Sequence, residues 1–285
     1  MTDIPEDHRS DPSLAAAGLG PTDATTSREA FTLPVGQLPV VGPPSTDLPV
    51  PAVAVAIGAH PDDVDFGCGG TLAKWAAAGC RTHHVVLTDG SKGTWDATTD
   101  QAGLVAARQQ EQRRAAELLG SQSVVFMGLV DGELRPGADE QRLLCQIIRQ
   151  LRPDVVIGHD PWRRYRLHPD HRHAGWLTVD AVVAARDPTF FPELPEPPHR
   201  PQRLLLFEPD DVNHVEDIRL TVERKVEAIL AHRSQHRTTM GFDGSDAEDL
   251  AGRHVLHTAV VRQASEHGAV AGLSAGEAFH RIDGI

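Results

Sequence analysis

The sequence predicts an α/β fold: a Rossmann-like, doubly wound and mostly parallel sheet with helices on both faces. Short runs rich in Val, Ile and Leu alternate with longer helical patterns, which is typical of a parallel sheet covered on both sides. Gly, Asp and His gather after several of these runs, and open α/β sheets bind their ligands at such strand ends. Both observations favour one sheet with a site at its carboxyl edge.

Five buried strands are expected from the apolar runs. Each run is short, rich in β-branched or aliphatic residues and bounded by polar or turn residues. The expected strands are 53–58, 82–88, 123–127, 154–158 and 203–208. With right-handed crossovers, we expect the strand order 3-2-1-4-5, in which the first and fourth strands are neighbours.

Helices are expected between and after these strands. One is expected to start at Thr71 after a Gly-rich turn, and another to end at Gly120, a typical helix stop. The expected helices are 70–79, 102–119, 139–151, 171–185, 217–232 and 246–264. The proline-rich segment 187–201 cannot form a helix and is expected to arch over one edge of the sheet as a lid or wall.

The chain of 285 residues is expected to hold one large domain. Residues 1–48 are rich in Pro, Gly, Asp, Ser and Thr and have no sustained apolar period. Such a segment buries too little apolar surface to offset the entropy of ordering. We therefore expect a disordered tail over 1–48 and a single α/β domain over 49–285.

Composition limits the partners. With 40 acidic and 27 basic residues, the formal net charge is −13, which disfavours nucleic acid and anionic membranes. The sequence shows neither a membrane-spanning apolar stretch nor a signal-peptide pattern, and its three cysteines favour reduced thiols over a disulfide framework. These features predict a cytoplasmic protein that binds a small molecule.

The segment "HPDD" at 60–63 directly follows the first expected strand. His60 and Asp63 can converge on one cation, and catalytic zinc sites use three N or O ligands with a fourth position for water. Asp62 then remains beside that water, where it can accept a proton as general base. Considered by itself, the segment has another interpretation, as a helix cap or Asx turn.

The segment "HPDH" at 168–171 follows the fourth expected strand. Because the first and fourth strands are neighbours in the expected order, the fold should bring the two clusters face to face. Either His168 or His171 would supply the third ligand. The other would be left to polarise a substrate carbonyl or to protonate a leaving amine.

These motifs resemble those of the PIG-L (LmbE-like) family of zinc-dependent N-acetylglucosaminide de-N-acetylases. The family pattern A-H-P-D-D-x-E with a Gly-rich turn compares with "AHPDDVDFGCGGT" at 59–71, and H-P-D-H stands at 168–171. Asp65 occupies a position where the family often has Glu, a difference expected to affect support of the ligands more than metal binding. Lesser matches bring the resemblance to about 50–235; they lie at 108–120, 126–132 and 225–235.

The resemblance implies a role for each matching residue of the metal centre. His60, Asp63 and His171 would hold zinc, with iron(II) as the alternative metal. Asp62 would be the general base that activates the water.

It also implies roles for residues around the metal. His168 would be the general acid or the group that stabilises the carbonyl, with Asp170 adjusting its charge. Arg108 and Asp131 match positions that hold sugar hydroxyls in relatives.

The expected function is a zinc hydrolase that removes an N-acyl group, foremost acetyl, from an amino-sugar conjugate such as an N-acetylglucosaminide. One alternative is a non-catalytic sugar- or nucleotide-binding α/β module; another is a metal-dependent phosphoesterase, which commonly uses two ions. The basic cluster Arg163, Arg164 and Arg166 fits either an anionic substrate or a solvated rim paired with nearby acids. The sequence does not determine the aglycone or the native metal. It also leaves open whether the protein is a monomer or a homo-oligomer.

Overall fold

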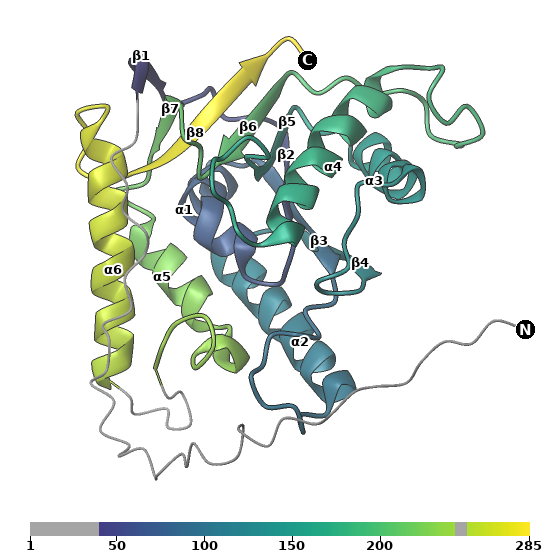
Figure 1. Cartoon of the computed structure of the whole chain (residues 1–285). Coiled ribbons are helices and arrows are strands. Elements are labelled where there is room, and N and C mark those ends of the chain that lie inside the picture. The colour runs from purple at the N-terminus through teal and green to yellow at the C-terminus, as the bar shows by residue number, and fades with distance from the viewer. Residues whose placement is uncertain (1–39, 243–249) are drawn as a thin grey trace, which may run out of the picture. The chain divides into compact units, whose positions relative to one another are not determined.

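The structure, a computed structural model, describes residues 40–242 and 250–285. These residues form one eight-stranded sheet in the order β1-β7-β8-β6-β5-β2-β3-β4 (Figure 1). All of its strands run in the same direction except β8, which is antiparallel to both of its neighbours. The strands are β1 (Val40–Thr46), β2 (Val53–Gly58), β3 (Arg81–Thr88), β4 (Ser123–Leu129), β5 (Val155–His159), β6 (Arg203–Phe207), β7 (Val212–Asp217) and β8 (Gly276–Asp283).

The five expected strands are β2 to β6, and they lie side by side as β4-β3-β2-β5-β6, the order that the sequence predicts. Strands β2 and β5 pair directly, with Ala54 opposite Val155 and Ala56 opposite Ile157. Parallel pairing in this register brings the carboxyl ends of β2 and β5 together. The loops that carry the two histidine motifs therefore leave the sheet next to each other.

Helices cover both faces of the sheet (Figure 1). Helices α3 (Ala138–Leu151) and α4 (Pro169–Arg186) lie on one face. On the other lie α1 (Asp63–Ala77), α2 (Gln101–Leu119), α5 (Val222–Leu230) and α6 (Leu250–Ala269). None of the described helices combines the length and the apolar character needed to cross a membrane.

The core explains why β2 is apolar throughout. Successive side chains of a strand point to opposite faces. Val55 and Ile57 pack with the helices α3 and α4, whereas Ala54 and Ala56 pack with Leu72 and other residues of α1. A strand buried on both faces has no solvent side, so it shows no polar alternation.

Helix α1 begins at Asp63, earlier than the expected start at Thr71. The helix is interrupted at Cys68, where φ is −149°. Beyond the interruption, the Glu277 carboxylate accepts hydrogen bonds from the backbone N–H groups of Gly70 (2.9 Å) and Thr71 (2.7 Å). The expected start is thus the start of the second half of α1, and a carboxylate from β8 caps it.

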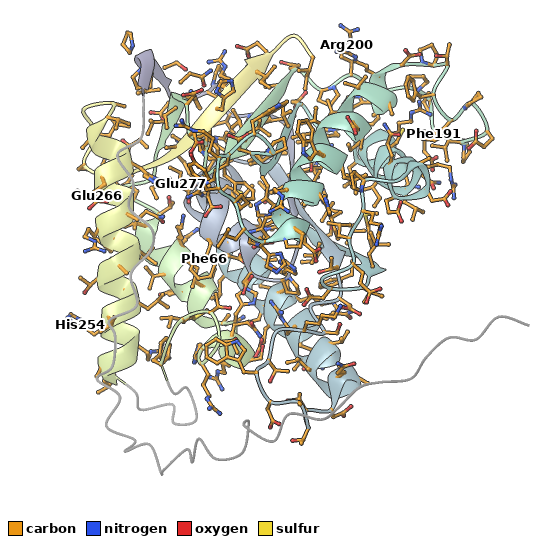
Figure 2. All side chains as sticks on the ribbon, in the orientation of Figure 1. Phe66, Phe191, Arg200, His254, Glu266 and Glu277 are labelled. Atoms are coloured by element: carbon orange, nitrogen blue, oxygen red, sulfur yellow. The ribbon has the colours of Figure 1, made fainter. Side chains whose placement is uncertain are left out.

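A buried lysine joins the two halves of α1. Lys225 Nζ donates to the carbonyl oxygen of Phe66 (2.7 Å) in the first half and to Glu277 Oε1 (2.6 Å). Phe66 and Glu277 are labelled in Figure 2, on α1 and β8. The interruption is therefore stabilised by groups that come from the C-terminal part of the chain.

The expected tail over 1–48 is wrong at its C-terminal end. Residues 40–46 form β1, which pairs with β7, and Leu48 is buried. Residues 1–39 lie outside the described residues. Strands β7 and β8 were not expected, because β7 contains several polar residues and β8 pairs antiparallel with β6 and β7 in the interior of the sheet.

The segment 187–201, expected to be a lid or wall over one edge of the sheet, forms no helix and is a wall. This segment connects the end of α4 to the start of β6, so it lies at the amino edge of the sheet, opposite the strand ends that carry the histidine motifs (Figure 1). Arg149 of α3 donates to the carbonyl oxygens of Asp187 (2.9 Å) and Phe190 (2.9 Å). The segment packs on α3 and closes this edge, and Figure 2 labels Phe191 there.

Candidate active site

A tight turn after β2 carries the first motif. The turn spans residues 59–62, between Gly58 and the first residue of α1, Asp63. A Cβ atom at position 58 would lie 2.9 Å from Cβ of Asp63, so the turn requires glycine. The backbone of Asp62 has φ of +106°, a conformation that residues other than glycine rarely adopt. Such strained residues often occur at functional sites.

Candidate ligand atoms of three side chains, one nitrogen from each of two histidines and the two oxygens of one carboxylate, lie close to one another. His60 Nδ1 lies 3.4 Å from Asp63 Oδ2 and 3.2 Å from His171 Nε2. His171 Nε2 lies 3.2 Å from Asp63 Oδ1. Ligand atoms bound tetrahedrally at about 2.0–2.1 Å from zinc are about 3.3–3.4 Å apart. The three side chains therefore form a group able to bind a metal ion.

The other nitrogen of His60 faces two carboxylates. His60 Nε2 lies 3.1 Å from Asp131 Oδ1 and 3.2 Å from Asp170 Oδ2. Burial disfavours the charged ring, but these carboxylates and Asp63 outweigh it and raise the pKa of His60 well above its usual value. A carboxylate at the far nitrogen is the usual support of a metal-binding histidine, because it fixes the tautomer and the ring orientation.

Asp170 has a further partner besides the expected one. Burial lowers the pKa of the His168 ring, the charge of Asp170 opposes this shift, and the carboxylate of Asp170 also contacts His60. The resemblance implies that its carboxylate adjusts the charge of His168. In the structure, Asp170 Oδ2 contacts His60 and accepts a hydrogen bond from the backbone N–H of Gly132 (2.6 Å). The backbone N–H of Asp170, in contrast, donates to His168 Nδ1 (3.2 Å).

His168 caps helix α4 through this contact. Its ring lies edge-on to that of His60, with centroids 4.7 Å apart, and stacks on that of His171 at 4.8 Å. Because Nδ1 accepts a hydrogen bond, the neutral ring carries its proton on Nε2. The exposed ring of His168 can thus donate a hydrogen bond from Nε2.

His159 belongs to the same cluster and was missed in the sequence. Its Nε2 lies 3.1 Å from Asp63 Oδ2, and its ring stacks on His171 with centroids 4.6 Å apart. Burial lowers the pKa of His159 to about 4. Asp63, His159 and His171 form a group able to bind a metal, as do His60, His168 and His171, and His60, Asp131 and Asp170. His159 directly follows the fourth expected strand, and this position could have revealed it as a candidate site residue.

Asp62 is held from helix α2. Gln112 Oε1 accepts a hydrogen bond from the backbone N–H of Asp62 (2.8 Å). Arg108 Nη2 donates to the carbonyl oxygen of Pro61 (2.6 Å) and lies 3.5 Å from Asp62 Oδ2. Burial raises the pKa of Asp62 to about 6, although Arg108 opposes this shift.

Gln112 also ties this turn to a buried ion pair. Gln112 Nε2 donates to Asp65 Oδ2 (2.8 Å), and the same oxygen lies 2.9 Å from His232 Nε2. Burial opposes their charged forms, yet the pKa of Asp65 is lowered and that of His232 is raised, because the two groups pair. Gln112 was missed because a run of polar residues does not reveal which of them point inward.

Two of the segments that match lesser family motifs, 108–120 and 225–235, contact each other near the pair of Asp65 and His232. Glu111 accepts hydrogen bonds from the backbone N–H (2.8 Å) and the hydroxyl (2.6 Å) of Ser234. Segments 108–120 and 225–235 are thereby joined behind the turn that carries Asp62. Both segments support the site from the side of α2 and α5.

The two residues expected to bind sugar hydroxyls are buried and have protein partners. Arg108 donates to the carbonyl oxygens of Pro61 and Gly90, and Asp131 contacts His60 and accepts from the backbone N–H of Lys92 (3.0 Å). A contact of either side chain with a sugar stays a prediction.

A cavity of about 650 Å³ opens beside the metal-binding group. Asp62, Asp63 and His171 border it on one side, and Gln263 and His267 of α6 border it on the other. A cavity of this size is within the usual range for small-molecule sites. The acidic and histidine side chains therefore face a space that a ligand can enter.

Comparison with known proteins decides the family. The PIG-L family model, described as GlcNAc-PI de-N-acetylase, matches residues 55–182. The diacetylchitobiose deacetylase of Thermococcus kodakarensis is 35% identical over 184 residues, which are 64% of this chain and 69% of that protein. The chain belongs to the PIG-L family.

Two further relatives of the PIG-L family extend the match. The solved structure of N,N′-diacetylchitobiose deacetylase from Pyrococcus horikoshii has a TM-score of 0.73 and 30% identity, and the match covers 82% of this chain and 85% of that one. A probable N-acetyl-α-D-glucosaminyl L-malate deacetylase from Bacillus anthracis is 29% identical over 188 residues, 63% of this chain and 79% of that protein. The PIG-L relatives thus act on different conjugates according to their names.

Proposed function

We propose that this protein is a metal-dependent hydrolase that removes the N-acetyl group from an amino-sugar conjugate. The observation that carries the proposal is the close grouping of His60 Nδ1, the Asp63 carboxylate and His171 Nε2 beside the strained Asp62. The names of the relatives, which are deacetylases, support the reaction type. His60, Asp63 and His171 would hold the ion, and N and O donors of this kind suit zinc, with iron(II) as the alternative.

The ion would supply Lewis-acid chemistry: it lowers the pKa of a water molecule and polarises the substrate carbonyl. Asp62 accepts the proton of the attacking water as the C–O bond forms to the acetyl carbon. His168 donates a hydrogen bond from Nε2 to the carbonyl oxygen. When the C–N bond breaks, Asp62 returns the proton to the leaving nitrogen, so that acetate and a free amine are released.

One present contact must change on metal binding. Arg166 Nη1 lies 2.9 Å from His171 Nδ1. A neutral imidazole that binds a cation through Nε2 carries its proton on Nδ1 and cannot accept a hydrogen bond there. We therefore expect Arg166 to leave His171 when the ion binds and to keep its ion pair with Glu208.

The alternatives gain less support. A two-metal phosphoesterase would need a second ion bridged by carboxylates, and the two separate groups, Asp63, His159 and His171 and His60, Asp131 and Asp170, have no carboxylate in common that could bridge two ions. A non-catalytic module gives no reason for a strained aspartate beside three ligand atoms. A cytoplasmic location stays a prediction, with which the three free, buried cysteines agree.

The test is a metal analysis of the purified protein paired with detection of free amine released from N-acetylglucosamine conjugates. We expect about one zinc or iron per chain and amine release, with both lost in His171→Ala. The matched control is His254→Ala, an exposed histidine on α6, which should keep both. A protein that binds no metal and releases no amine after zinc or iron is added would overturn the proposal.

A further inference from the structure

Every cationic side chain that borders the 650 Å³ cavity has an acidic partner. Lys225 pairs with Glu277 at 2.6 Å, and Arg164 with Asp210 at 3.1 Å. Arg163 Nη1 lies 3.3 Å from Glu208 Oε2, and Arg166 Nη2 pairs with the same oxygen. The three arginines of the basic cluster next to the active site thus face two carboxylates, which leaves one net positive charge of three and favours the paired rim over an anion site.

Glu208 differs from the other acidic partners because it serves two arginines. It follows β6 directly, at the carboxyl edge of the sheet, and it borders the same cavity as Asp63 and His171. Its φ is +54°, in the left-handed region that non-glycine residues seldom adopt. A backbone conformation of this kind persists only when the surrounding contacts impose it, so the position of this carboxylate is fixed by the fold.

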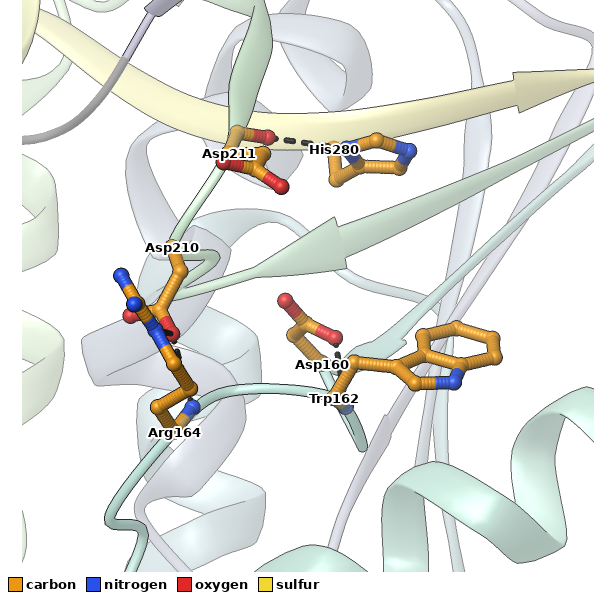
Figure 3. Close-up of a pocket in the computed structure, with 6 residues that line it drawn as sticks. All are labelled: Asp160, Trp162, Arg164, Asp210, Asp211 and His280. Atoms are coloured by element: carbon orange, nitrogen blue, oxygen red, sulfur yellow. Dashed lines mark hydrogen bonds and ion pairs between the residues drawn. The ribbon is translucent and has the colours of Figure 1, made fainter.

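The surface next to the cavity is acidic as well. Arg164 also borders a second pocket of about 450 Å³, shown in Figure 3. Three carboxylates line this pocket, those of Asp160, Asp210 and Asp211. Figure 3 shows Arg164 joined to Asp210 there. An anionic group approaching the cavity from this side would meet like charge, which disfavours binding.

We propose that Glu208 is a specificity-determining residue that prevents Arg163 and Arg166 from binding an anion. The enzyme then selects amino-sugar conjugates whose second half is uncharged, such as another acetamido sugar, over conjugates that carry carboxylates or phosphates. This inference rests on the proposed deacetylase function. It explains how one family scaffold can discriminate by charge without any change in the metal-binding group.

The inference is tested with two substrates that differ in charge, N,N′-diacetylchitobiose and N-acetylglucosaminyl malate. The measured quantity is the ratio of their kcat/KM values for the zinc-loaded protein. We expect the unmodified protein to prefer the neutral disaccharide. Glu208→Gln leaves two unpaired arginines at the cavity, so the ratio should shift toward the malate conjugate by about five- to tenfold.

The matched control is Glu117→Gln, which removes the same charge from an exposed ion pair with Arg114 on α2 and should leave the ratio unchanged. If Glu208→Gln does not fold, Arg163→Ala gives the second test. With one arginine removed, the preference for the neutral substrate should increase, since Glu208 then faces Arg166 alone.

A native preference for the malate conjugate, or a ratio that neither variant moves, would overturn the role of Glu208 while leaving the deacetylase function intact. Absence of amine release from both substrates and from the inositol conjugate of N-acetylglucosamine would instead overturn the proposed function, and the specificity inference with it. The two failures are therefore distinguishable.

Discussion

The two edges of the sheet each contain a buried arginine, and the protein uses the two side chains differently. At the amino edge, all three guanidinium nitrogens of Arg149 donate to backbone carbonyl oxygens, among them those of Ala184 and Ala185. At the carboxyl edge, Arg108 donates to two carbonyl oxygens, and its buried Nε has no partner among the described residues. The third contact of Arg108 is with Asp62 at 3.5 Å.

The difference between the two arginines suggests that the amino edge serves the stability of the fold and the carboxyl edge serves the function. A side chain whose donors are all satisfied by backbone carbonyls fixes the fold of the segment around it. Several buried polar atoms at the carboxyl edge lack a partner among the described residues, namely Arg108 Nε, Asp65 Oδ1, Asp170 Oδ1, Arg166 Nε and His232 Nδ1. Other such atoms lie away from the site, for example those of Trp75 and Arg203. Because buried unsatisfied groups are costly and uncommon, the unpartnered atoms next to the histidine motifs mark positions where the fold loses stability at the site.

The largest expected effect is that of Asp62→Asn. The amide keeps the shape of the side chain but cannot accept the proton of the attacking water, so kcat should fall by about 10²–10⁴-fold. Metal content and thermal stability should stay close to those of the unmodified protein. Steady-state amine release and metal analysis check this, and a variant with full activity would show that Asp62 is not the base.

The second effect should appear at the other edge. Arg149→Met removes the donors to the buried carbonyl oxygens of Ala184 and Ala185 and to those of the partly exposed segment that follows, and we expect the free energy of unfolding to fall by about 3 kcal/mol. Urea denaturation measures this change. Amine release per folded molecule should not change, and a loss of kcat at full stability would contradict the division between the two edges.

A smaller effect is expected for Gln112→Leu, because it removes the hydrogen bonds to the backbone of Asp62 and to Asp65 while keeping the size of the side chain. We expect kcat to fall about tenfold with little change in KM, since the turn that carries Asp62 loses its support. Arg114→Leu on the exposed face of the same helix is the control. An equal loss in both variants would indicate a general effect on α2.

The smallest effect concerns β7, the strand next to the edge strand β1 and separated from β5 and β2 by β8 and β6. Glu216 is buried, which raises the pKa of its carboxyl, but His214 at 2.9 Å and Lys74 outweigh burial and lower it. A lowered pKa in the folded state stabilises the protein above the unfolded-state pKa of about 4.5, and this stabilisation is lost as the pH falls through the folded-state pKa. Glu216→Gln should therefore be less stable than the unmodified protein at pH 7 by about 1–2 kcal/mol, with a difference that shrinks below about pH 4. Urea denaturation at several pH values checks this, and a difference independent of pH would exclude the ion pairs as its cause.

The sequence could predict the central five strands and the meeting of the two histidine motifs, because both follow from local apolar runs and the handedness of crossovers. It could not predict which polar side chains hold the histidine motifs and α1 in place. Gln112 reaches Asp62 and Asp65 from another helix, and Glu277 reaches α1 from the last strand. Such contacts depend on which face of a helix or strand turns inward, and polar residues carry no period that reveals it.

The resemblance placed Asp170 beside His168, and sequence proximity alone supports that view. In the folded chain the helix start also turns the carboxylate toward His60, while its charge still acts on His168. The contact with His60 depends on the backbone conformation and could not be predicted from the motif.

The position of β8 has a consequence for synthesis. It follows the other described strands in the sequence, yet it lies between β6 and β7 and provides the Glu277 cap of α1. Until it is made, β6 and β7 each present an unpaired edge, which is prone to wrong pairing with other chains. The second half of α1 therefore gains its carboxylate cap, and the two parts of the sheet are joined, only after synthesis has passed Glu277.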